Sequence, residues 1–425
     1  MRTFASLMPR GALFAGLALA MLFGARPASA QDDYGDPSGK TLTVTADLRL
    51  IAANGEQSWI DGGFGKTRFG PSSDRFQLQP RAIEGDVVWR PHLSWSVDAT
   101  IAATVQDGAD NPGLSEAYLS FRRAPHGNFR AHARAGLFWP PVSLEHSGPE
   151  WAVTDTITPS AINSWIGEEV KVGGVETGGD WRFGGHRVSL TAALFGFNDT
   201  AGTLLAFRGW AFNDEKATAF GLQQLPPLDA FMSYAQAPRT RPVIELDNRP
   251  GYYVRLGWAP PVPVKLSLFY YDNRGDPEAV TPALQWGWHT RFANLGAVID
   301  ATPTLRFKAQ AVTGRTEMGF AMPDRLWVDT RFRSAFLLAT QTIGQGSISG
   351  RVEAFGTTGE GSVLGADESE HGWATTFAAK RKFGHHVTLL GEVLHTESTR
   401  NARLRAALNP YQPQTVAQFA VRLRM

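Results

Sequence analysis

Residues 95–106, WSVDATIAATVQ, show the pattern that decides the fold. Apolar side chains occupy every second position, from Val97 to Val105. The positions between them, from Asp98 to Gln106, are mostly polar. Because successive side chains of a β-strand point to opposite faces, this period of two predicts a strand with one apolar and one polar face.

The same alternation continues along the chain to its last residue, and apolar repeats at helical spacing are nearly absent. It is less regular near 75–89, 168–183 and 285–300, where we expect β-bulges. The clearest further two-faced segments are 116–122, 129–137, 252–258, 264–270, 305–311, 348–354 and 418–425.

The connections between these segments fall into two alternating classes, short and long. The short turns lie at 90–92, 124–127, 184–185, 259–263, 301–303, 344–346 and 384–385. The long loops lie at about 53–74, 107–113, 140–166, 198–242, 273–284, 317–325, 358–371 and 398–413. Seven short turns and eight long loops join 16 strands, with both chain ends on the short-turn side.

Such a sheet is typical of a transmembrane β-barrel. Closure removes the free edges that an open sheet of this size would present. Trp89, Trp95 and Trp258 flank short turns, where an interfacial aromatic girdle is expected. A soluble sandwich or propeller is the alternative, but its outer faces would be polar and its connections would not alternate in length. We therefore predict an all-β fold, a 16-stranded antiparallel transmembrane β-barrel.

The first 30 residues have the pattern of a secretory signal peptide. Arg2 and Arg10 precede the apolar run 13–25, and small residues at 28–30 provide a cleavage site. We expect residues 1–30 to be removed and residues 31–425 to form a single barrel domain in the outer membrane of a Gram-negative bacterium. No later apolar run approaches the length of a membrane-spanning helix, about 18 residues.

Charge and composition exclude several classes of protein. The leader holds three Arg and no acidic residue, so the mature chain has 41 − 3 = 38 basic and 40 acidic side chains, a formal net charge of −2. This balance argues against a nucleic-acid binder. The chain has no Cys, which excludes disulfides, thiolate metal sites and a cysteine nucleophile.

Several short stretches resemble the phosphate-selective porin O and P family of outer-membrane channels. They are ARAGLFWPPVSL at 133–144, EAY at 116–118, RVEAF at 351–355 and QFAVRLR at 418–424. The resemblance implies a homotrimeric channel whose third long loop, 140–166, folds inward and constricts the pore. This sequence departs from the family because that loop contains no Lys or Arg, and because the chain ends in Met425 where such barrels usually end in an aromatic residue.

The faces opposite the apolar stripes are expected to line the pore. Basic side chains outnumber acidic ones there, which favours anions unless loop acids and cross-strand pairs cancel the field. The predicted pore-lining residues are Arg122, Arg130, His132, Arg134, Arg255, Lys265, Arg306, Lys308, Arg351, Glu116 and Glu353. The predicted constriction residues are Glu145, His146, Glu150 and Asp155, with the acids expected to face Arg130 and Arg134.

The sequence carries no specific catalytic or metal-binding motif. His146 beside Glu145 lacks a second spaced ligand, so we expect a solvated loop and not a metal or acid–base site. Loop 198–242 is apolar for a surface loop and packs either into the vestibule or against a neighbouring subunit.

We therefore expect an outer-membrane porin for passive diffusion of small hydrophilic solutes, with weak anion preference. Outer-membrane lipid and such solutes or anions are its expected partners, and no cofactor is expected. The alternatives are a plugged structural or adhesive barrel and an outer-membrane hydrolase, which needs a Ser/His/acid set distributed over the strands.

Overall fold

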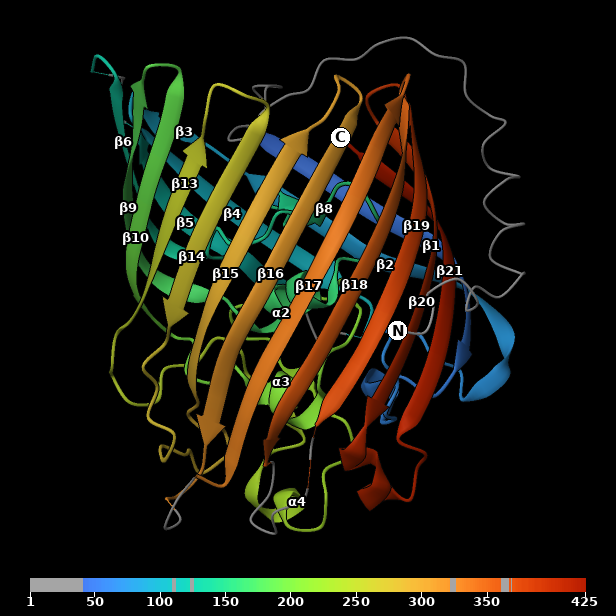
Figure 1. Cartoon of the computed structure of the whole chain (residues 1–425). Helices are drawn as coiled ribbons and strands as arrows, with labels where there is room; N and C mark the ends of the chain where they lie inside the picture. The colour runs from blue at the N-terminus through green and yellow to red at the C-terminus, as the bar shows by residue number, and fades with distance from the viewer. Residues whose placement is uncertain (1–40, 109–111, 123–125, 322–325, 361–366, 368) are drawn as a thin grey trace, which may run out of the picture.

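The computed structural model describes residues 41–108, 112–122, 126–321, 326–360, 367 and 369–425, so the expected signal peptide lies outside the described residues. Its main feature is one antiparallel sheet whose first strand pairs with its last (Figure 1). This closing pair runs from Thr45↔Arg424 to Ala53↔Val416. The sheet is therefore a closed barrel, with the short turns at the top of Figure 1 and the long loops at the bottom.

Sixteen strands form the barrel wall, as predicted. In chain order they are β1 (Leu42–Gly55), β2 (Ser73–Trp89), β4 (Val97–Gln106), β5 (Gly113–Arg122), β6 (Phe129–Phe138), β9 (Val172–Phe183), β10 (His186–Gly196), β13 (Gly251–Ala259), β14 (Val264–Asp272), β15 (His289–Asp300), β16 (Leu305–Met318), β17 (Val328–Ile343), β18 (Gly346–Glu360), β19 (Glu370–Phe383), β20 (Val387–Arg400) and β21 (Tyr411–Arg424). The short strand β3 (His92–Ser94) pairs with β4 inside a short turn.

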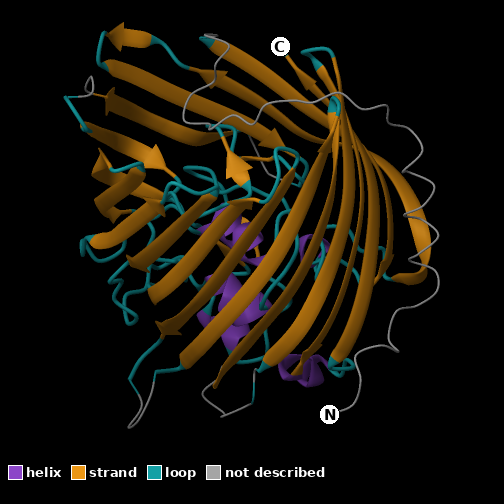
Figure 2. Ribbon diagram, turned by 45° about the horizontal axis from the view of Figure 1, so that its top comes forward, coloured by secondary structure: helices purple, strands orange, loops and turns teal. Residues whose placement is uncertain are grey.

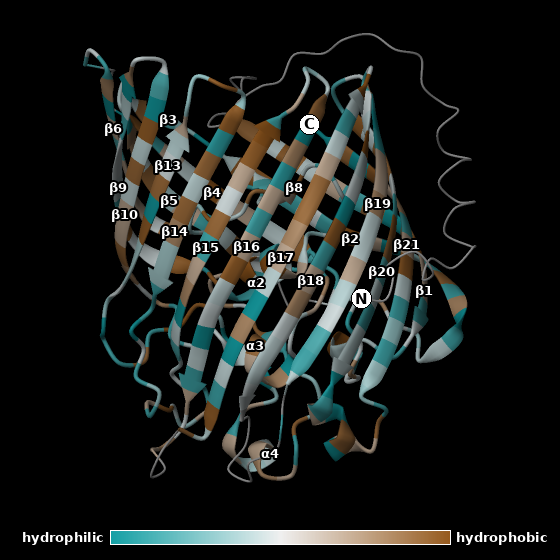
Figure 3. Ribbon diagram, viewed as in Figure 1, coloured by the Kyte–Doolittle hydropathy of each residue, from teal (hydrophilic) through white to brown (hydrophobic). Residues whose placement is uncertain are grey.

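The exposure of side chains is inverted relative to a soluble protein. On β4 the apolar Ile101 and Val105 are 39% and 54% exposed, whereas Thr104 between them is buried. Figure 3 shows the alternation of hydrophobic and hydrophilic residues along the strands of the wall. The apolar residues that are exposed on the outer face form the apolar band of the barrel. An apolar exterior around a polar interior is what a lipid-facing barrel requires, and it excludes the soluble sandwich.

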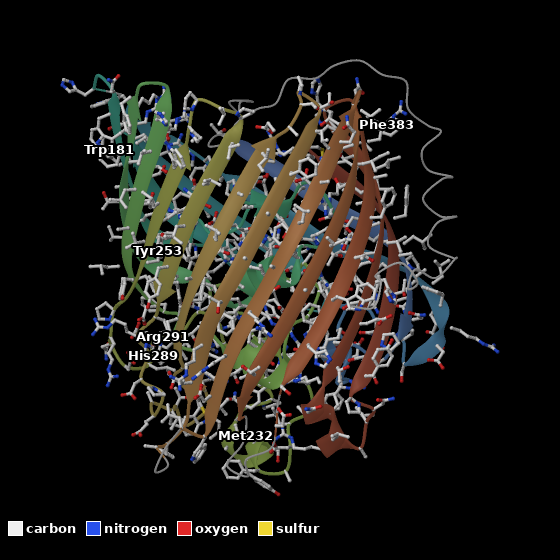
Figure 4. All side chains as sticks on the ribbon, viewed as in Figure 1. Trp181, Met232, Tyr253, His289, Arg291 and Phe383 are labelled. Atoms are coloured by element: carbon white, nitrogen blue, oxygen red, sulfur yellow. The ribbon has the colours of Figure 1, made fainter. Side chains whose placement is uncertain are left out.

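Aromatic side chains mark the short-turn rim. Trp95, Trp181, Trp258 and Phe383 are all exposed near short turns. Figure 4 labels Trp181 and Phe383 at this end of the barrel. Amphipathic aromatic rings prefer the boundary between lipid and water, so this rim lies at a membrane interface.

Register shifts interrupt the wall in two strand pairs, β1–β2 and β4–β5. In the β1–β2 pair, Asp47 faces Glu84 but Leu48 faces Ala82, so Ile83 is an extra residue. In the β4–β5 pair, Ser115 is extra in the same way. The bulge on β2 explains the irregular alternation seen near 75–89.

The wall is lower on one side. β4, β5 and β6 each have 10 residues, whereas β2 has 17. β2 pairs with β4 only from Glu84 onward, so within the described residues its segment 73–82 is hydrogen-bonded to β1 alone. Phe76 and Leu78 on this segment are exposed.

Two long loops carry secondary structure into the barrel. Figure 2 shows helices enclosed by the ring of strands. The helices that these two loops carry inside are α2 (Ala161–Glu169) and α3 (Thr203–Arg208). The described residues also form α4 (Met232–Ala235), at the long-loop end in Figure 1, and the 3-10 helices η2 (Trp59–Asp61) and η3 (Asn401–Ala406) in two other long loops. The short loop strands are β7 (His146–Ser147), β8 (Ala152–Val153), β11 (Gln223–Gln224) and β12 (Arg239–Thr240). No helix in the described ranges is long and apolar enough to cross a membrane.

The helix α2 is fully buried inside the barrel. Ser160 caps its first turn by accepting a hydrogen bond from Asn163 N at 3.4 Å. Trp165 packs edge-on against Phe292 and Phe332, which point inward from the wall. The sequence did not indicate this helix, because a helix buried on all sides shows no amphipathic period.

Loop 197–250 joins the same interior cluster. Leu205, Trp210 and Phe212 are buried with α2 and with inward-pointing wall aromatics. The sequence left open whether this loop packs into the vestibule or against a neighbouring subunit, and these side chains pack inside the barrel.

Candidate functional site: the lumen where loop 139–171 meets the wall

Loop 139–171 connects β6 to β9, and its segment 145–161 makes polar contacts on the far side of the barrel. The partners of this segment lie on β16, β18, β19, β20 and β21, and β18 is half-way round the barrel from β6. These contacts fix the segment between two opposite parts of the wall.

Arg351 on β18 is the central anchor of this loop. Its guanidinium donates hydrogen bonds to the carboxylates of Glu145 and Glu353, each at 2.8 Å. It also donates to the carbonyl oxygens of Thr158 at 2.9 Å and Pro159 at 3.1 Å. The Arg351 side chain is fully buried. A buried charge is tolerated only with such complete pairing, so these bonds tie the loop to one point on the wall.

Carboxylates on the wall accept hydrogen bonds from backbone N–H groups of the loop. These N–H groups are not paired with a neighbouring strand. Glu392 accepts hydrogen bonds from Ile157 N at 2.6 Å and Thr158 N at 3.0 Å. Glu353 accepts one from Ala161 N at 2.8 Å, at the start of α2. The first N–H groups of a helix lack intrahelical partners and favour negative charge, so this carboxylate stabilises α2 in place.

Two other loop acids pair with basic wall residues. Asp155 contacts Lys308 Nζ at 2.8 Å, and Glu150 contacts Arg424 at 3.0 Å. Burial acts to raise the pKa of the Asp155 carboxyl, but Lys308 outweighs it and lowers this pKa below its usual value. The acids thus enter the lumen as ion pairs.

Basic wall residues also bind carbonyl oxygens of the loop. Arg422 donates to Val153 O at 2.9 Å, and Lys380 donates to Thr154 O at 2.6 Å. Segment 150–158 therefore follows the basic wall formed by β16 and β19–β21.

The prediction that the loop acids face Arg134 is wrong. Arg134 on β6 forms a two-point ion pair with Glu176 on the adjacent strand β9, at 2.8 and 3.0 Å. Its guanidinium lies 4.0 Å from the ring centroid of Phe138, and the hydroxyl of Tyr253 donates to the same Glu176. A cross-strand neighbour is held at fixed distance by the sheet, and here it satisfies Arg134.

A stack of four side chains runs through the base of the loop. Lys171 Nζ lies 3.1 Å from the ring centroid of Trp139, which stacks on Trp151 at 4.9 Å, and Trp151 stacks on His146 at 4.6 Å. Burial lowers the pKa values of both Lys171 and His146 well below their usual ranges. Sequence analysis missed Lys171 and Trp139, whose cation–π contact depends on the fold of the loop.

His146 has a polar neighbour in Ser143, 2.9 Å from its Nδ1. The Ser143 hydroxyl oxygen also accepts hydrogen bonds from Glu145 N at 3.1 Å and His146 N at 3.2 Å. This pattern is typical of a serine that stabilises a turn.

Loop 197–250 contributes charges that the sequence analysis did not identify. Asp214 pairs with Arg49 on β1 and with Arg68, and Lys216 pairs with Glu84 on β2. Burial acts to raise the pKa of Asp214, but the two arginines outweigh it and lower this pKa. Burial opposes the charge of Lys216, yet wall carboxylates raise its pKa to about 12.

One acidic group among the described residues has oxygens close enough to share a cation. Asp199, Glu245 and Asp247 place one oxygen each within 4.8 Å of one another. Asp199 accepts a hydrogen bond from Leu246 N at 2.5 Å, and Glu245 accepts one from Phe197 N at 2.9 Å. Burial raises the pKa of Asp199 to about 7.

The predicted pore-lining residues all occupy inward-facing strand positions. Arg122 and Arg130 are exposed; His132, Arg134, Arg255, Lys265, Arg306 and Lys308 are half-buried; Glu116, Arg351 and Glu353 are buried. Of the predicted constriction residues, Glu145 and Glu150 are buried, whereas His146 and Asp155 are half-buried.

Basic side chains dominate the half of the lumen nearer the short turns. The inward-facing charged residues there that stay exposed or half-buried divide into a basic set and a smaller acidic set. The basic set is Arg122, Arg130, Arg182, Arg187, Arg255, Lys265, Arg306, Lys308, Lys380, Lys382, Arg422 and Arg424, and the acidic set is Asp98, Asp180 and Asp300. Some of these basic residues are paired, since Arg306 contacts Asp300, Lys308 contacts Asp155 and Arg422 contacts the buried Asp47. The remaining excess favours a positive potential along this part of the wall.

No family model matches the sequence, and no curated protein matches it either. Solved structures of similar fold include the outer-membrane channel DcaP of Acinetobacter baumannii, with a TM-score of 0.55 at 9% identity over 93% of this chain and 100% of that one. They also include a loop-deletion mutant of OmpT, an outer-membrane protein of Vibrio cholerae, with a TM-score of 0.50 at 8% identity over 91% and 99%. The chain therefore shares the β-barrel fold of outer-membrane channels.

Proposed function

We propose that this protein is an outer-membrane porin through which small hydrophilic solutes diffuse, with a weak preference for anions. The observation that carries the proposal is the excess of basic side chains on the short-turn half of the lumen. Charge of one sign on a low-dielectric wall raises the local concentration of the opposite ion. The strands hold these side chains at fixed positions, and loop 139–171 narrows the path beside them.

The preference is weak because the acids of the loop oppose the basic wall. Glu145 pairs with Arg351, Glu150 with Arg424 and Asp155 with Lys308. The opposite charges of each pair largely cancel each other's field at a distance. The sequence resemblance to phosphate-selective porins supports anion passage. A dedicated phosphate site is not part of the proposal, since loop 140–166 contains no Lys or Arg.

Planar-bilayer recording of the purified protein tests this proposal. We expect discrete conductance steps. In a tenfold KCl gradient, we expect a reversal potential of the sign that indicates higher permeability for Cl⁻ than for K⁺. A cation-side reversal potential contradicts the anion preference, and a complete absence of steps from folded protein contradicts the porin.

A plugged structural barrel is the second candidate, favoured by the filled interior. The α2 helix is buried on all sides, and loop 197–250 packs against it. Liposome swelling distinguishes the two, since a plugged barrel leaves the liposomes impermeable to small sugars and a porin does not.

An outer-membrane hydrolase is a third candidate. Its support is a single contact, between Ser143 and His146. The hydroxyl of Ser143 is occupied by two backbone N–H donors, so we assign it a turn-forming role. Covalent labelling of Ser143 by a fluorophosphonate probe would favour the hydrolase instead.

We further propose that the protein forms a homotrimer through its low wall. The segment 73–82 of β2 presents a strand edge beside the exposed Phe76 and Leu78. Unpaired backbone groups are costly in lipid, so a second subunit covering this edge stabilises it. Native mass spectrometry in mild detergent tests the trimer, and Leu78→Glu should shift the protein toward monomers.

A further inference from the structure

Three arginine side chains form a row on the outer face of the barrel near the long loops. Arg291 on β15 is the cross-strand partner of Arg315 on β16, which is the partner of Arg331 on β17. Arg333 lies two residues farther from the loops, opposite Thr313. Figure 4 labels Arg291 toward the loop end of its strand.

The row lies at the boundary between the apolar band and the loops. The neighbouring residues Thr316 and Thr330 are buried and point inward, so the arginines point outward. Farther from the loops, the outward Leu295 and Leu337 are exposed members of the apolar band. Outer-membrane barrels have short periplasmic turns and longer extracellular loops, so this is the level at which lipid headgroups of the outer leaflet meet the barrel.

Carboxylates neutralise part of the row. Arg315 contacts Asp329 at 2.5 Å and Glu317 at 3.0 Å, and Arg291 shares Glu317 at 3.3 Å. Both acids lie nearer the loops than the row does, because Glu317 and Asp329 are themselves cross-strand partners one step beyond it. The side of the row that faces the membrane therefore stays positive.

Arg331 and Arg333 supply that positive charge. Both are exposed, and neither forms a hydrogen bond or ion pair with another residue in the described part of the chain. Arg331 lies directly opposite Arg315, and Arg333 lies two residues from Arg331 on the same face of β17. Like charges at such positions in a sheet repel, and the repulsion is stronger beside apolar surface than in water. An anion bound between them would remove this repulsion.

We propose that Arg331 and Arg333, together with Arg291 and Arg315, bind the anionic headgroup of an outer-leaflet phosphorylated glycolipid. Guanidinium groups match phosphate through paired N–H donors, which makes arginine suited to this ligand. The apolar band below the row accommodates the acyl chains, so charge and apolar surface are arranged in the order that such a lipid requires. This site lies outside the lumen and stands whether or not the barrel conducts.

The test uses the folded full-length protein in phosphatidylcholine nanodiscs with or without bis-phosphorylated lipid A. The readout is lipid A retained after extraction and counted by native mass spectrometry. Wild-type protein is compared with Arg333→Gln and with Arg331→Gln/Arg333→Gln. Arg381→Gln is the matched control, because Arg381 points outward at the opposite, short-turn rim. Heat-modifiable electrophoretic mobility verifies that each variant is folded.

We expect the double variant to bind lipid A roughly tenfold more weakly than wild type, and Arg333→Gln to be intermediate. The control should bind as wild type does, and wild-type binding should weaken at high salt. Equal binding by the folded double variant and wild type would overturn the proposal. Two other results would also overturn it. If inorganic phosphate alone stabilised the folded protein as much as lipid A does, the arginines would form an ion site. If the subunits of the double variant dissociated without loss of lipid A, the arginines would belong to an interface between copies.

Discussion

Replacing Arg351 by Met should release loop 139–171 from the wall. The guanidinium is fully buried and bonded to two carboxylates and two loop carbonyls. Its loss leaves Glu145 and Glu353 buried, close together and without a counter-charge. Removing one partner of a buried ion pair costs roughly 3–5 kcal/mol. At about 1.4 kcal/mol per factor of ten, the ratio of docked to released loop falls by on the order of 10² to 10³.

Single-channel recording at high salt measures this release. We expect Arg351→Met to conduct more than wild type and with greater current noise, because a released loop no longer narrows the path at one fixed position. Adding Glu145→Gln should recover part of the wild-type behaviour, since it removes one of the two uncompensated charges. Arg130→Met, at an exposed lumen position outside the loop, is the control and should change stability by no more than about 0.5 kcal/mol. Wild-type conductance and noise from folded Arg351→Met protein would refute the anchoring role.

Three further predictions concern topology, selectivity and pH. The long loops of such a barrel face the cell exterior and its short turns face the periplasm. Since the chain has no Cys, Leu404→Cys in a long loop should react with an impermeant maleimide on intact cells, whereas His385→Cys in a short turn should not; the reverse pattern contradicts this orientation. Replacing Arg122 and Arg130 together by Gln should move the reversal potential in a salt gradient toward cations, and an unchanged potential places both outside the conducting path. Burial raises the pKa of Glu169 to about 7, so the folded state holds this proton more tightly than the unfolded state between pH 4.5 and about 7. This contribution, about 3 kcal/mol, is present at pH 4.5 and is lost as pH rises through that window. Thermal unfolding in detergent should show a fall in stability from pH 5 to pH 8 that is smaller in Glu169→Gln, and equal slopes would contradict the assignment.

The wall of the barrel was predictable from sequence because its determinants are local. Each strand must alternate lipid-facing and lumen-facing side chains, so Ile101 and Val105 reveal one face and Thr104 the other. Turn length is equally local, and the alternation of short and long connections gave both the number of strands and the end at which the chain begins and finishes. Bulges such as that at Ile83 were visible only as a weakened pattern.

The interior was not predictable, because its contacts join residues far apart in sequence. Glu145 meets Arg351 across 206 positions, and no local pattern distinguishes that partner from Arg134. Arg134 instead binds Glu176, its neighbour on the adjacent strand. Such choices depend on where the loops pass once the wall has closed.

The sequence alone thus determined the strand faces, the turns, the end of the barrel at which the chain begins and finishes, and the excess of basic residues on the inner face. The tertiary structure decided that loop 197–250 packs inside the barrel, that α2 is buried there, and that each loop acid has its own wall partner. The physical reason is the range of the forces involved. Strand alternation follows from lipid on one side of each strand, whereas ion pairs and apolar packing in the lumen depend on which groups remain unsatisfied after the whole sheet has closed.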